Sequence, residues 1–459
     1  MSPLEFDLVI IGSGSGNSII GPEWDDKRVA VVEAGTFGGT CLNVGCIPTK
    51  MYVYAAEVAS MVAGSSRYGI DAQVTAVHWP AIRDRIFGRI DPISESGREY
   101  RRDGNNTTLL TGWARFTGPR QLEVSGPDGT VTEISGAQVV IATGSRPVLP
   151  PVLRECPVPV HTSDTVMRVP TLPGSMLVVG GGYIAAELAH VFGALGTAVT
   201  LVNRTDVMLR DQDADVSGAF TEAACRQWDV RLETEVVHVQ AVGDGARVEL
   251  SDGHVAEVDL ILAATGRTPN SDGMGVDAAG VEVHDDGRIV VDEYGRASAE
   301  GVWALGDVSS PYQLKHVANH EARVVRHNLS HPEDLQAFRH DVVPAAVFTH
   351  PQIAMVGLTE QQARDAGYRV SVSTQAYGDV AYGWAMEDEH SFMKVVGDRQ
   401  TGLVLGAHLF GAQSPSLIQP LIQAMTLSIP ARQVAREQYW IHPALAEVVE
   451  NALLGLEVD

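Results

Sequence analysis

Residues 6–17 read Phe-Asp-Leu-Val-Ile-Ile-Gly-Ser-Gly-Ser-Gly-Asn, an apolar run that ends in a glycine-rich turn. The run predicts a buried strand, and the glycines allow backbone N–H groups to approach the pyrophosphate of a dinucleotide. A second strand is predicted at 29–32 and ends at Glu33, whose carboxylate can accept hydrogen bonds from a ribose. Asn17 in the third position and the early Gly21-Pro22 depart from the usual pattern, so a tight structural turn is the alternative.

The same pattern returns at 176–202. An apolar strand enters Gly180-Gly-Gly-Tyr-Ile-Ala185, and a helix over about 184–195 leads to a strand at 198–202. That strand ends at Asn203-Arg204, with Arg210 close behind, where NAD-binding units carry an acid. Two arginines without a carboxylate suit a 2′-phosphate, so we expect NADPH; a solvated basic turn is the alternative.

Two further junctions, 139–144 and 260–266, each run from an apolar strand into Thr-Gly with a proline three residues later. They predict crossings of the chain between the two nucleotide units. The proline-rich stretch 154–173 predicts a linker. Alternating strands and helices from Asp341 onward predict a third, α+β domain.

Composition excludes several classes of protein. The 459 residues predict about three domains, and the formal charge of −24 argues against nucleic acid or an anionic membrane surface as partner. The sequence has no apolar run of membrane-spanning length and no signal-peptide pattern at its start, so we expect a cytoplasmic protein. Four cysteines make no disulfide scaffold, and no Cys/His cluster has the spacing of a metal site.

Two of the four cysteines stand five positions apart in residues 38–50, Gly-Gly-Thr-Cys-Leu-Asn-Val-Gly-Cys-Ile-Pro-Thr-Lys. A regular helix would separate their Cα atoms by about 7.5 Å, too far for a disulfide, but Gly45 can relax the backbone. Cys46 is expected near the N-terminus of a helix that continues through Met61, where the partial positive charge favours a thiolate. Lys50 shares its helix face. The pattern favours a redox-active pair; two buried structural thiols are the alternative.

This segment resembles the hallmark of the flavoprotein disulfide reductases, and the resemblance covers the whole chain. It implies FAD and NADPH as cofactors and an α/β fold with two Rossmann-like dinucleotide-binding domains and a C-terminal α+β dimerisation domain. The ranges expected are 1–150 for the first part of the FAD domain, 151–269 for the NADPH domain, 270–340 for the second part of the FAD domain and 341–459 for the dimerisation domain.

The resemblance also implies residue roles. Cys41 attacks the substrate disulfide, and Cys46 faces the flavin and resolves the mixed disulfide. Lys50 lies by the flavin and pairs with Glu187, and Tyr183 gates the nicotinamide pocket. The implied FAD contacts are Gly12, Gly14, Gly16, Asn17, Glu33, Gly39, Thr40, Lys50, Thr143, Gly144 and Asp307, which belongs to the motif at 302–307. The implied NADPH contacts are Gly180, Gly182, Tyr183, Ile184, Glu187, Asn203, Arg204, Arg210 and Gly266.

A histidine and a glutamate stand near the C-terminus as His442-Pro443-x-x-x-Glu447. Proline disfavours helix before itself and favours a helix start after it, so the glutamate can reach back to orient the imidazole. The pair resembles the family's acid/base pair, which protonates the leaving thiolate. In the family this histidine serves the cysteines of the partner subunit, which implies a homodimer.

Within the family, residues 14–18, 46–51, 377–384 and 438–443 are similar to the mycothione reductases of actinobacteria. These enzymes reduce the disulfide of mycothiol, a cysteinyl glucosamine–inositol thiol. Dihydrolipoamide dehydrogenase, which usually has an acid in place of Asn203, and glutathione reductase are the alternatives within the family. A flavin-binding interaction protein without catalysis is the alternative from another class. Cys156 and Cys225 are expected to be buried apolar thiols.

Overall fold

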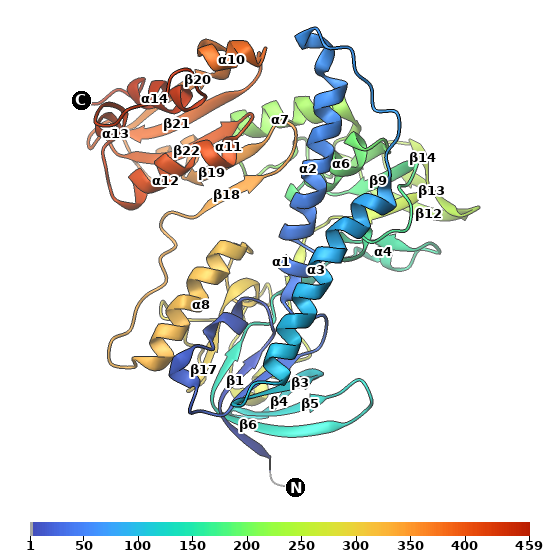
Figure 1. The fold of residues 1–459 in the computed structure, drawn as a ribbon, viewed down its shortest axis with the longest axis vertical. Helices are drawn as coiled ribbons and strands as arrows, with labels where there is room; N and C mark the ends of the chain where they lie inside the picture. The colour runs from blue at the N-terminus through green and yellow to red at the C-terminus, as the bar shows by residue number, and fades with distance from the viewer. Residues whose placement is uncertain (1–2) are drawn as a thin grey trace.

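The computed structural model describes residues 3–459, which form five sheets, and the three larger sheets are each covered by helices (Figure 1). The first sheet has the strand order β3-β2-β1-β6-β5-β4, and β17 also pairs with β6. Strands β1, β2, β3, β6 and β17 run parallel, whereas β4, β5 and β6 form an antiparallel meander. The strands are β1 (Leu4–Ile11), β2 (Val29–Glu33), β3 (Thr107–Thr111), β4 (Trp113–Gly118), β5 (Gln121–Ser125), β6 (Val131–Ile141) and β17 (Val302–Ala304).

The connection between β1 and β2 is interrupted at Gly21-Pro22, where the sequence departs from the usual pattern. It consists of two short 3-10 helices, η1 (Ser15–Ile19) and η2 (Pro22–Trp24), separated by Gly21. Proline lacks an N–H and disfavours helix in the residue before it, so Gly21-Pro22 ends the first helical segment after little more than one turn.

The second sheet is parallel, with the strand order β11-β10-β9-β15-β8. Helix α6 (Tyr183–Ala194) connects β9 to β10 in the way that the second glycine pattern predicts. A separate antiparallel sheet, β12-β13-β14, lies on the same part of the chain (Figure 1). The strands are β8 (Val160–His161), β9 (Ser175–Val179), β10 (Ala198–Val202), β11 (Asp229–Arg231), β12 (Val236–Val242), β13 (Gly245–Leu250), β14 (Val255–Val258) and β15 (Leu260–Ala263).

The chain crosses between the first two sheets through a two-stranded antiparallel ribbon, β7 (Ser145–Pro147) with β16 (Arg267–Pro269). The two Thr-Gly junctions therefore mark crossings, as the sequence predicts. The stretch 154–173 is more ordered than the linker we expected, because it contributes β8 to the edge of the second sheet and the short helix α5 (Ser163–Val166). The pairing of β17 with β6 returns the chain to the first sheet after the second is complete. The domain boundaries themselves stay a proposal.

The C-terminal part is built on an antiparallel sheet with the order β18-β19-β22-β21-β20, as an α+β domain requires. Its strands are β18 (Pro344–Val347), β19 (Ile353–Gly357), β20 (Val370–Ala376), β21 (Phe392–Asp398) and β22 (Val404–Phe410). Its helices are α9 (Glu360–Asp365), α10 (Ala381–Ala385), α11 (Ser414–Leu417), α12 (Gln419–Thr426), α13 (Ala431–Arg436) and α14 (Ala446–Leu454).

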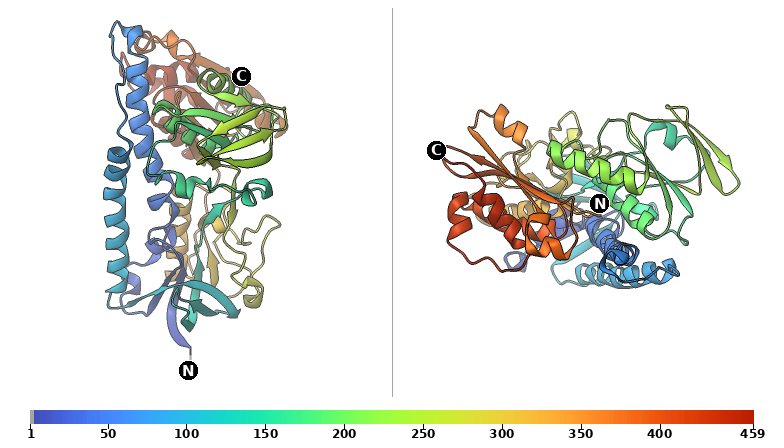
Figure 2. Two further views of the ribbon diagram at one scale, coloured as in Figure 1. Left: turned by 90° about the vertical axis from the view of Figure 1, so that its right-hand side faces the viewer. Right: turned by 90° about the horizontal axis from the view of Figure 1, so that it is seen from above.

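Long helices run lengthwise along one edge of the molecule (Figure 2). They are α2 (Cys46–Ala63) and α3 (Trp79–Arg102). Trp79 of α3 stacks on Tyr52 of α2 with ring centroids 4.9 Å apart and meets Phe192 of α6 at 5.1 Å. This buried aromatic cluster fixes α2 against α6, so the start of α2 has a defined place between the two nucleotide units. None of the helices in residues 3–459 is both long and apolar enough to span a membrane.

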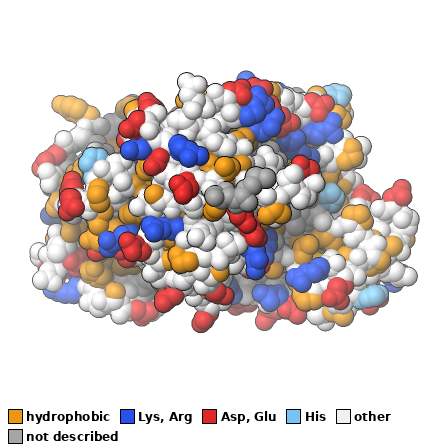
Figure 3. Space-filling view, turned by 90° about the horizontal axis from the view of Figure 1, so that it is seen from below, with side chains coloured by type: hydrophobic (Ala, Val, Ile, Leu, Met, Phe, Trp, Pro, Cys, Tyr) orange, Lys and Arg blue, Asp and Glu red, His pale blue; other side chains and the backbone are white. Residues whose placement is uncertain are grey.

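Seen from below, the end of the molecule that carries the N-terminus shows interspersed acidic and basic side chains (Figure 3).

Candidate active site

The two cysteines of the hallmark segment lie at a break between helices. Helix α1 (Gly39–Asn43) contains Cys41, and Cys46 is the first residue of α2, as expected. Gly45 makes the break possible, because a Cβ there would lie 3.0 Å from the carbonyl oxygen of Thr40 and 3.3 Å from the Cα of Cys41. Only glycine permits this close approach of the chain to itself, which is how the two thiols come together.

The pair is electrostatically asymmetric. A hydrogen bond from Cys41 lowers the pKa of Cys46 to about 7, against the opposing effect of burial, and the Lys50 charge lowers it further. The same hydrogen bond, reinforced by burial, raises the pKa of Cys41. At neutral pH, Cys46 is therefore the residue that holds the thiolate. Cys46 is exposed in the chain without ligands, in keeping with a surface that a cofactor covers.

Lys50 and Glu187 form an ion pair between the two nucleotide units. Lys50 Nζ lies 2.6 Å from Glu187 Oε2, and the Glu187 side chain is only 5% exposed. The N–H of Phe348 donates to the other oxygen of Glu187 at 3.0 Å, and Lys50 Nζ lies 4.7 Å from the centre of the Phe348 ring. Three parts of the chain thus meet behind Cys46.

The first glycine loop is held by Glu33. The N–H and hydroxyl of Ser13 donate to Glu33 Oε2 at 2.9 and 2.6 Å, and the N–H of Gly35 donates to Oε1 at 2.7 Å. A Cβ on Gly12 would stand 2.3 Å from the Ala142 carbonyl oxygen. Glu33 therefore shapes the loop in addition to the expected ribose contact, and Ser13 is a site residue that the sequence reasoning missed.

Close backbone approach continues around this loop. Gly39 has φ +74° and a Cβ on it would lie 2.7 Å from the Cα of Gly14, and a Cβ on Gly16 would lie 2.5 Å from the Cβ of Ala142. Asn17 Oδ1 accepts from Nε of the buried Arg101 at 2.8 Å, and the Asn17 backbone carbonyl accepts from Nη2 at 3.0 Å; the side-chain bond explains the departure from the usual small residue. The cradle of small residues fits a pyrophosphate, as FAD binding requires.

The remaining expected FAD residues lie where the chain crosses between sheets. Thr143 donates to the carbonyl oxygen of Asn270 at 2.9 Å, and Gly144 accepts from the N–H of Asn270 at 2.9 Å. Asp307 accepts from Ser145 at 2.7 Å, and Ser145 accepts from the buried Arg267 at 2.8 Å. Ser145 and Arg267 had no motif to reveal them, because their link joins residues far apart in the sequence.

The second glycine loop is more open. A Cβ on Gly180 would stand 2.2 Å from the Ala264 carbonyl oxygen, whereas Gly182 has open space beside it and is exposed. Tyr183 begins α6, is 43% exposed and lies one turn from Glu187, and Ile184 is half-buried. Gly266, with φ +113°, ends the second crossing junction. The loop fits a pyrophosphate at the N-terminus of a regular α-helix.

The loop after β10 presents two exposed guanidinium groups, each with one loosely paired carboxylate. The Arg204 and Arg210 side chains are 80% and 67% exposed, with their closest carboxylates at 4.0 and 3.7 Å. Asn203 is buried, and its Nδ2 donates to Thr205 and Val207 within the loop, so its visible contribution is to shape the loop. Two exposed arginines with only long ion-pair contacts at this place suit a 2′-phosphate.

His442 and Glu447 come together as the sequence suggested. His442 Nδ1 lies 2.8 Å from Glu447 Oε1, and this hydrogen bond lowers the pKa of Glu447. Helix α14 begins at Ala446, slightly later than directly after the proline. The pair lies between α13 and α14, on the side of the C-terminal domain away from α1 and α2 (Figure 1). The single chain does not bring His442 to Cys41.

The two other cysteines lie elsewhere. Cys156 is half-buried and donates to the carbonyl oxygens of Leu153 and Val158. Cys225, on α7 (Ala214–Gln227), is exposed, so the expectation that it is buried is wrong. It lies on the solvent side of an amphipathic helix whose buried positions are taken by other residues.

Comparison with known proteins identifies the family to which this architecture belongs. The family model for pyridine nucleotide-disulphide oxidoreductases matches residues 6–322, and the model for the dimerisation domain of the same enzymes matches residues 343–453. The chain belongs to the pyridine nucleotide-disulphide oxidoreductase family. Its enzyme class, fold and cofactors are those predicted from the sequence: a disulfide oxidoreductase that works with FAD and NADPH. The matched dimerisation domain supports the expected homodimer.

Relatives in this family cover nearly the whole chain. Mycothione reductase of Mycobacterium tuberculosis H37Rv is 56% identical over 98% of this chain and 99% of its own length. Glutathione reductase of Burkholderia cepacia is 33% identical over 97% and 98%, and dihydrolipoyl dehydrogenase of Thermus scotoductus is 35% identical over 98% and 97%.

Solved structures of the family share the fold. The HOCl-induced flavoprotein disulfide reductase RclA of Escherichia coli has a TM-score of 0.86 and 28% identity, covering 98% of this chain and 99% of that chain. LpdA of Mycobacterium tuberculosis has a TM-score of 0.85 at 22% identity, covering 98% and 99%, a likeness of fold alone.

Proposed function

We propose that this chain is a mycothione reductase, which reduces the disulfide of mycothiol with NADPH through the pair Cys41 and Cys46. The observation that carries the substrate is the 56% identity to the mycothione reductase of Mycobacterium tuberculosis over almost the full length of both chains. The glutathione reductase and the dihydrolipoyl dehydrogenase are only 33% and 35% identical. The thiol pair and the Lys50–Glu187 ion pair behind it support the chemistry.

The chemistry runs through thiol–disulfide exchange. When bound, FAD and NADPH supply the two electrons that convert the Cys41–Cys46 disulfide to a dithiol. Cys41 then loses its proton and attacks one sulfur of the substrate, which forms a mixed disulfide and expels the first thiolate. The Cys46 thiolate attacks the Cys41 sulfur, restores the protein disulfide and releases the second thiolate. Each expelled thiolate takes up one proton, so one substrate disulfide yields two thiols.

We infer that the acid/base group in these steps is the partner subunit's His442. Within one chain, the His442–Glu447 pair is remote from α1 and α2, and His442 is 69% exposed. Glu447 engages Nδ1 and leaves Nε2 for a thiol. Tyr439 and Ile441, just before the histidine, are strongly exposed, as expected of residues that a second subunit covers.

The cellular location and the domain boundaries belong to the same proposal. A disulfide that cycles between oxidised and reduced forms suits a reducing, cytoplasmic compartment. The boundaries near 150, 269 and 340 fit the crossing ribbon and the return of β17 to the first sheet.

The first experiment is a substrate panel with the purified holoenzyme. Mycothiol disulfide, glutathione disulfide and lipoamide are each offered with NADPH, and the initial rates are compared. We expect mycothiol disulfide to have the highest kcat/KM. A higher kcat/KM for either of the other two substrates would overturn the substrate assignment while leaving the disulfide reductase class intact.

The second experiment separates the two cysteines. Cys41→Ser should lower disulfide turnover by about a thousandfold or more, whereas NADPH should still bleach the flavin absorbance, because Cys46 and the cofactor sites remain. Cys225→Ser, at an exposed cysteine remote from the pair, is the matched control and should keep full turnover. A Cys41→Ser variant that still reduces substrate would contradict the division of roles.

A further inference from the structure

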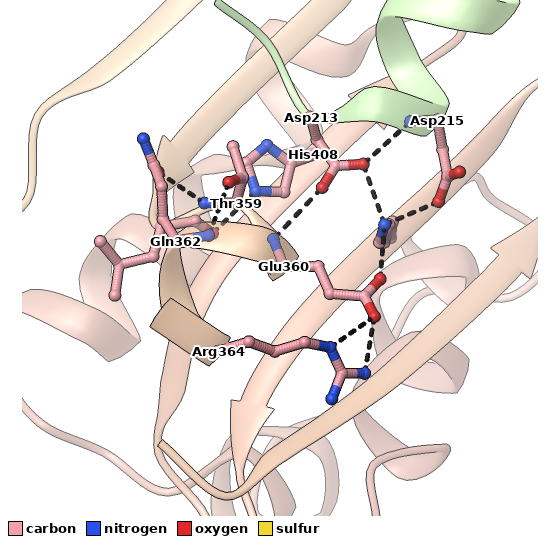
Figure 4. A network of polar contacts seen from close by, with 9 residues as sticks. Asp213, Asp215, Thr359, Glu360, Gln362, Arg364 and His408 are labelled. Atoms are coloured by element: carbon pink, nitrogen blue, oxygen red, sulfur yellow. Dashed lines mark hydrogen bonds and ion pairs between the residues drawn. The ribbon is translucent and has the colours of Figure 1, made fainter. Parts of the chain in front are cut away.

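A buried lysine lies where the second nucleotide unit meets the C-terminal domain (Figure 4). Lys394, on β21, is 3% exposed. Its Nζ lies 3.0 Å from Asp213 Oδ1, 2.6 Å from Asp215 Oδ2 and 2.9 Å from Glu360 Oε2. All three ammonium hydrogens therefore have a carboxylate acceptor, a full set of partners that buried charges require.

The acceptors come from two domains. Asp213 and Asp215 stand at the N-terminus of α7, and Glu360 is the first residue of α9 in the C-terminal domain. The N–H of Glu360 also donates to Asp213 Oδ2 at 3.3 Å, and Arg364 donates to Glu360 from the other side, at 2.7 Å. Of the three carboxylates Asp213 is the most buried, with its side chain 2% exposed. It is thus fixed from the C-terminal domain at both of its oxygens.

Asp213 ends the loop that carries the arginines. It caps α7 by accepting from the N–H of Asp215 at 3.2 Å, and it follows Arg210 by three residues. Leu209, directly before Arg210, has φ +52°, a conformation that costs a non-glycine residue free energy unless its surroundings hold it. The Leu209 N–H donates to the carbonyl oxygen of Gly181 at 2.8 Å, which ties the turn to the glycine loop on one side.

We propose that Lys394 is a positioning residue for NADPH: by fixing Asp213 it holds the turn 209–213 in the shape that presents Arg210 to the 2′-phosphate. This role rests on the proposed use of NADPH and on the expected binding of its 2′-phosphate by Arg204 and Arg210. It gives the C-terminal domain a part in cofactor selection, although Lys394 lies 184 positions after Arg210. Without Lys394, the buried Asp213 charge loses its compensation and the turn loses its anchor.

The test uses Lys394→Met in the holoenzyme and measures ligand binding by calorimetry. The probes are 2′,5′-ADP, which carries the 2′-phosphate, and 5′-AMP, which lacks it. We expect the affinity for 2′,5′-ADP to fall about tenfold, because a displaced charge loses most of its directed contact, while the affinity for 5′-AMP is unchanged. The kinetic counterpart is a raised KM for NADPH at unchanged kcat. Lys27→Met, which removes an exposed lysine from the first domain, is the matched control and should change neither affinity.

A purely structural tie between domains gives a different result. In that case Lys394→Met lowers the melting temperature but binds both probes as the parent does, which overturns the proposal. Equal weakening of both probes also overturns it, since that indicates general damage to the site.

A second variant, Asp213→Asn, tests the proposal if the Lys394→Met protein fails to fold. Asp213→Asn keeps an oxygen for the helix cap but loses the charge that pairs with Lys394 and the acceptor for Glu360 N–H. We expect its affinity for 2′,5′-ADP to fall by about threefold and its affinity for 5′-AMP to stay the same. An unchanged affinity for 2′,5′-ADP overturns the proposal.

Arg210→Ala distinguishes this inference from the proposed function. If Arg210→Ala leaves 2′,5′-ADP affinity intact, the proposed role of the arginines fails. If Arg210→Ala lowers the affinity for 2′,5′-ADP and Lys394→Met does not, only the proposed role of Lys394 is wrong.

Discussion

The two nucleotide-binding units share the backbone geometry of their glycine loops and differ in the charged residues at the end of their second strand. In each, a parallel strand ends in a glycine whose Cβ would collide with a carbonyl oxygen of the neighbouring strand's extension, Ala142 in the first unit and Ala264 in the second. At the end of the second strand the first unit has Glu33, engaged with Ser13, and the second unit has Asn203 followed by the exposed Arg204 and Arg210. We therefore propose that the backbone of the glycine loops binds dinucleotides as a class, and that the charge after the second strand selects which dinucleotide is bound.

The largest effect on cofactor binding should come from adding a Cβ to the closely packed glycine of each unit, one unit at a time. Gly12→Ala places a Cβ 2.3 Å from Ala142 oxygen at φ +104°, so we expect a protein that retains no FAD, measured from the visible spectrum after purification. Gly180→Ala makes the equivalent collision in the second unit and should keep FAD but lose NADPH binding. Loss of FAD from Gly180→Ala would show that the two glycine loops are not independent.

The next largest effect, on the KM for NADPH, concerns the arginines that follow β10. Replacing both Arg204 and Arg210 by Ala should raise the KM for NADPH by about 10- to 100-fold, since each arginine–phosphate contact is a charge-assisted hydrogen bond. The KM for NADH should stay within about twofold, because NADH has no 2′-phosphate. Equal KM changes for the two cofactors would refute the assignment of the arginines.

A smaller effect tests the ion pair that joins the two units. Lys50 lowers the pKa of Cys46, so Lys50→Met should raise it above about 7, and less thiolate is then present at pH 7. Glu187 acts in the opposite direction, so Glu187→Gln should lower the pKa of Cys46. The pH dependence of Cys46 alkylation in the reduced holoenzyme reports both, with shifts of about one pH unit. Shifts of the same sign in the two variants would contradict this electrostatic account.

The smallest effect, on stability, concerns Asn17, which stands in the first glycine loop where the usual pattern has a small residue. Asn17→Ala removes the side-chain acceptor of the buried Arg101 Nε but keeps the backbone carbonyl that accepts from Nη2, and it should destabilise the fold by about 1–3 kcal/mol. The melting temperature should then fall by a few degrees. Ser18→Ala, which removes a single exposed hydroxyl next in the chain, is the control and should leave the melting temperature unchanged. An unchanged Asn17→Ala protein would mean that Asn17 is a neutral replacement.

How much the sequence could predict depended on the distance over which each feature acts. The strands, α6 and the cysteine pair follow from local patterns, because glycine spacing and apolar periodicity record short-range geometry. The interruption after β1 could be predicted from Gly21-Pro22, whereas the 3-10 form of the two short helices on either side could not. The linker 154–173 was underestimated because β8 has only two residues, too few for a pattern.

The site partners that had no motif are the long-range ones. Lys394 and Asp213 are 181 residues apart, Arg101 and Asn17 are 84 apart, and Arg267 and Ser145 are 122 apart. Such pairs are created by packing of whole domains, so spacing in one sequence carries no trace of them. Lys50 with Glu187 was predicted only because a family resemblance supplied the pairing.

The crossing ribbon has a consequence for the history and engineering of the chain. Because β7 and β16 are paired antiparallel, residues 148 and 266 lie side by side, bonded from Val148 N–H to the Gly266 carbonyl oxygen. Everything between them is a closed loop of chain whose two ends meet, the arrangement that makes domain insertion and circular permutation tolerable. The second nucleotide unit therefore enters and leaves the chain at one place. An exchange for the equivalent unit of a relative would keep the connections of the first sheet, provided that the new unit also preserves the partners of Lys50 and Lys394.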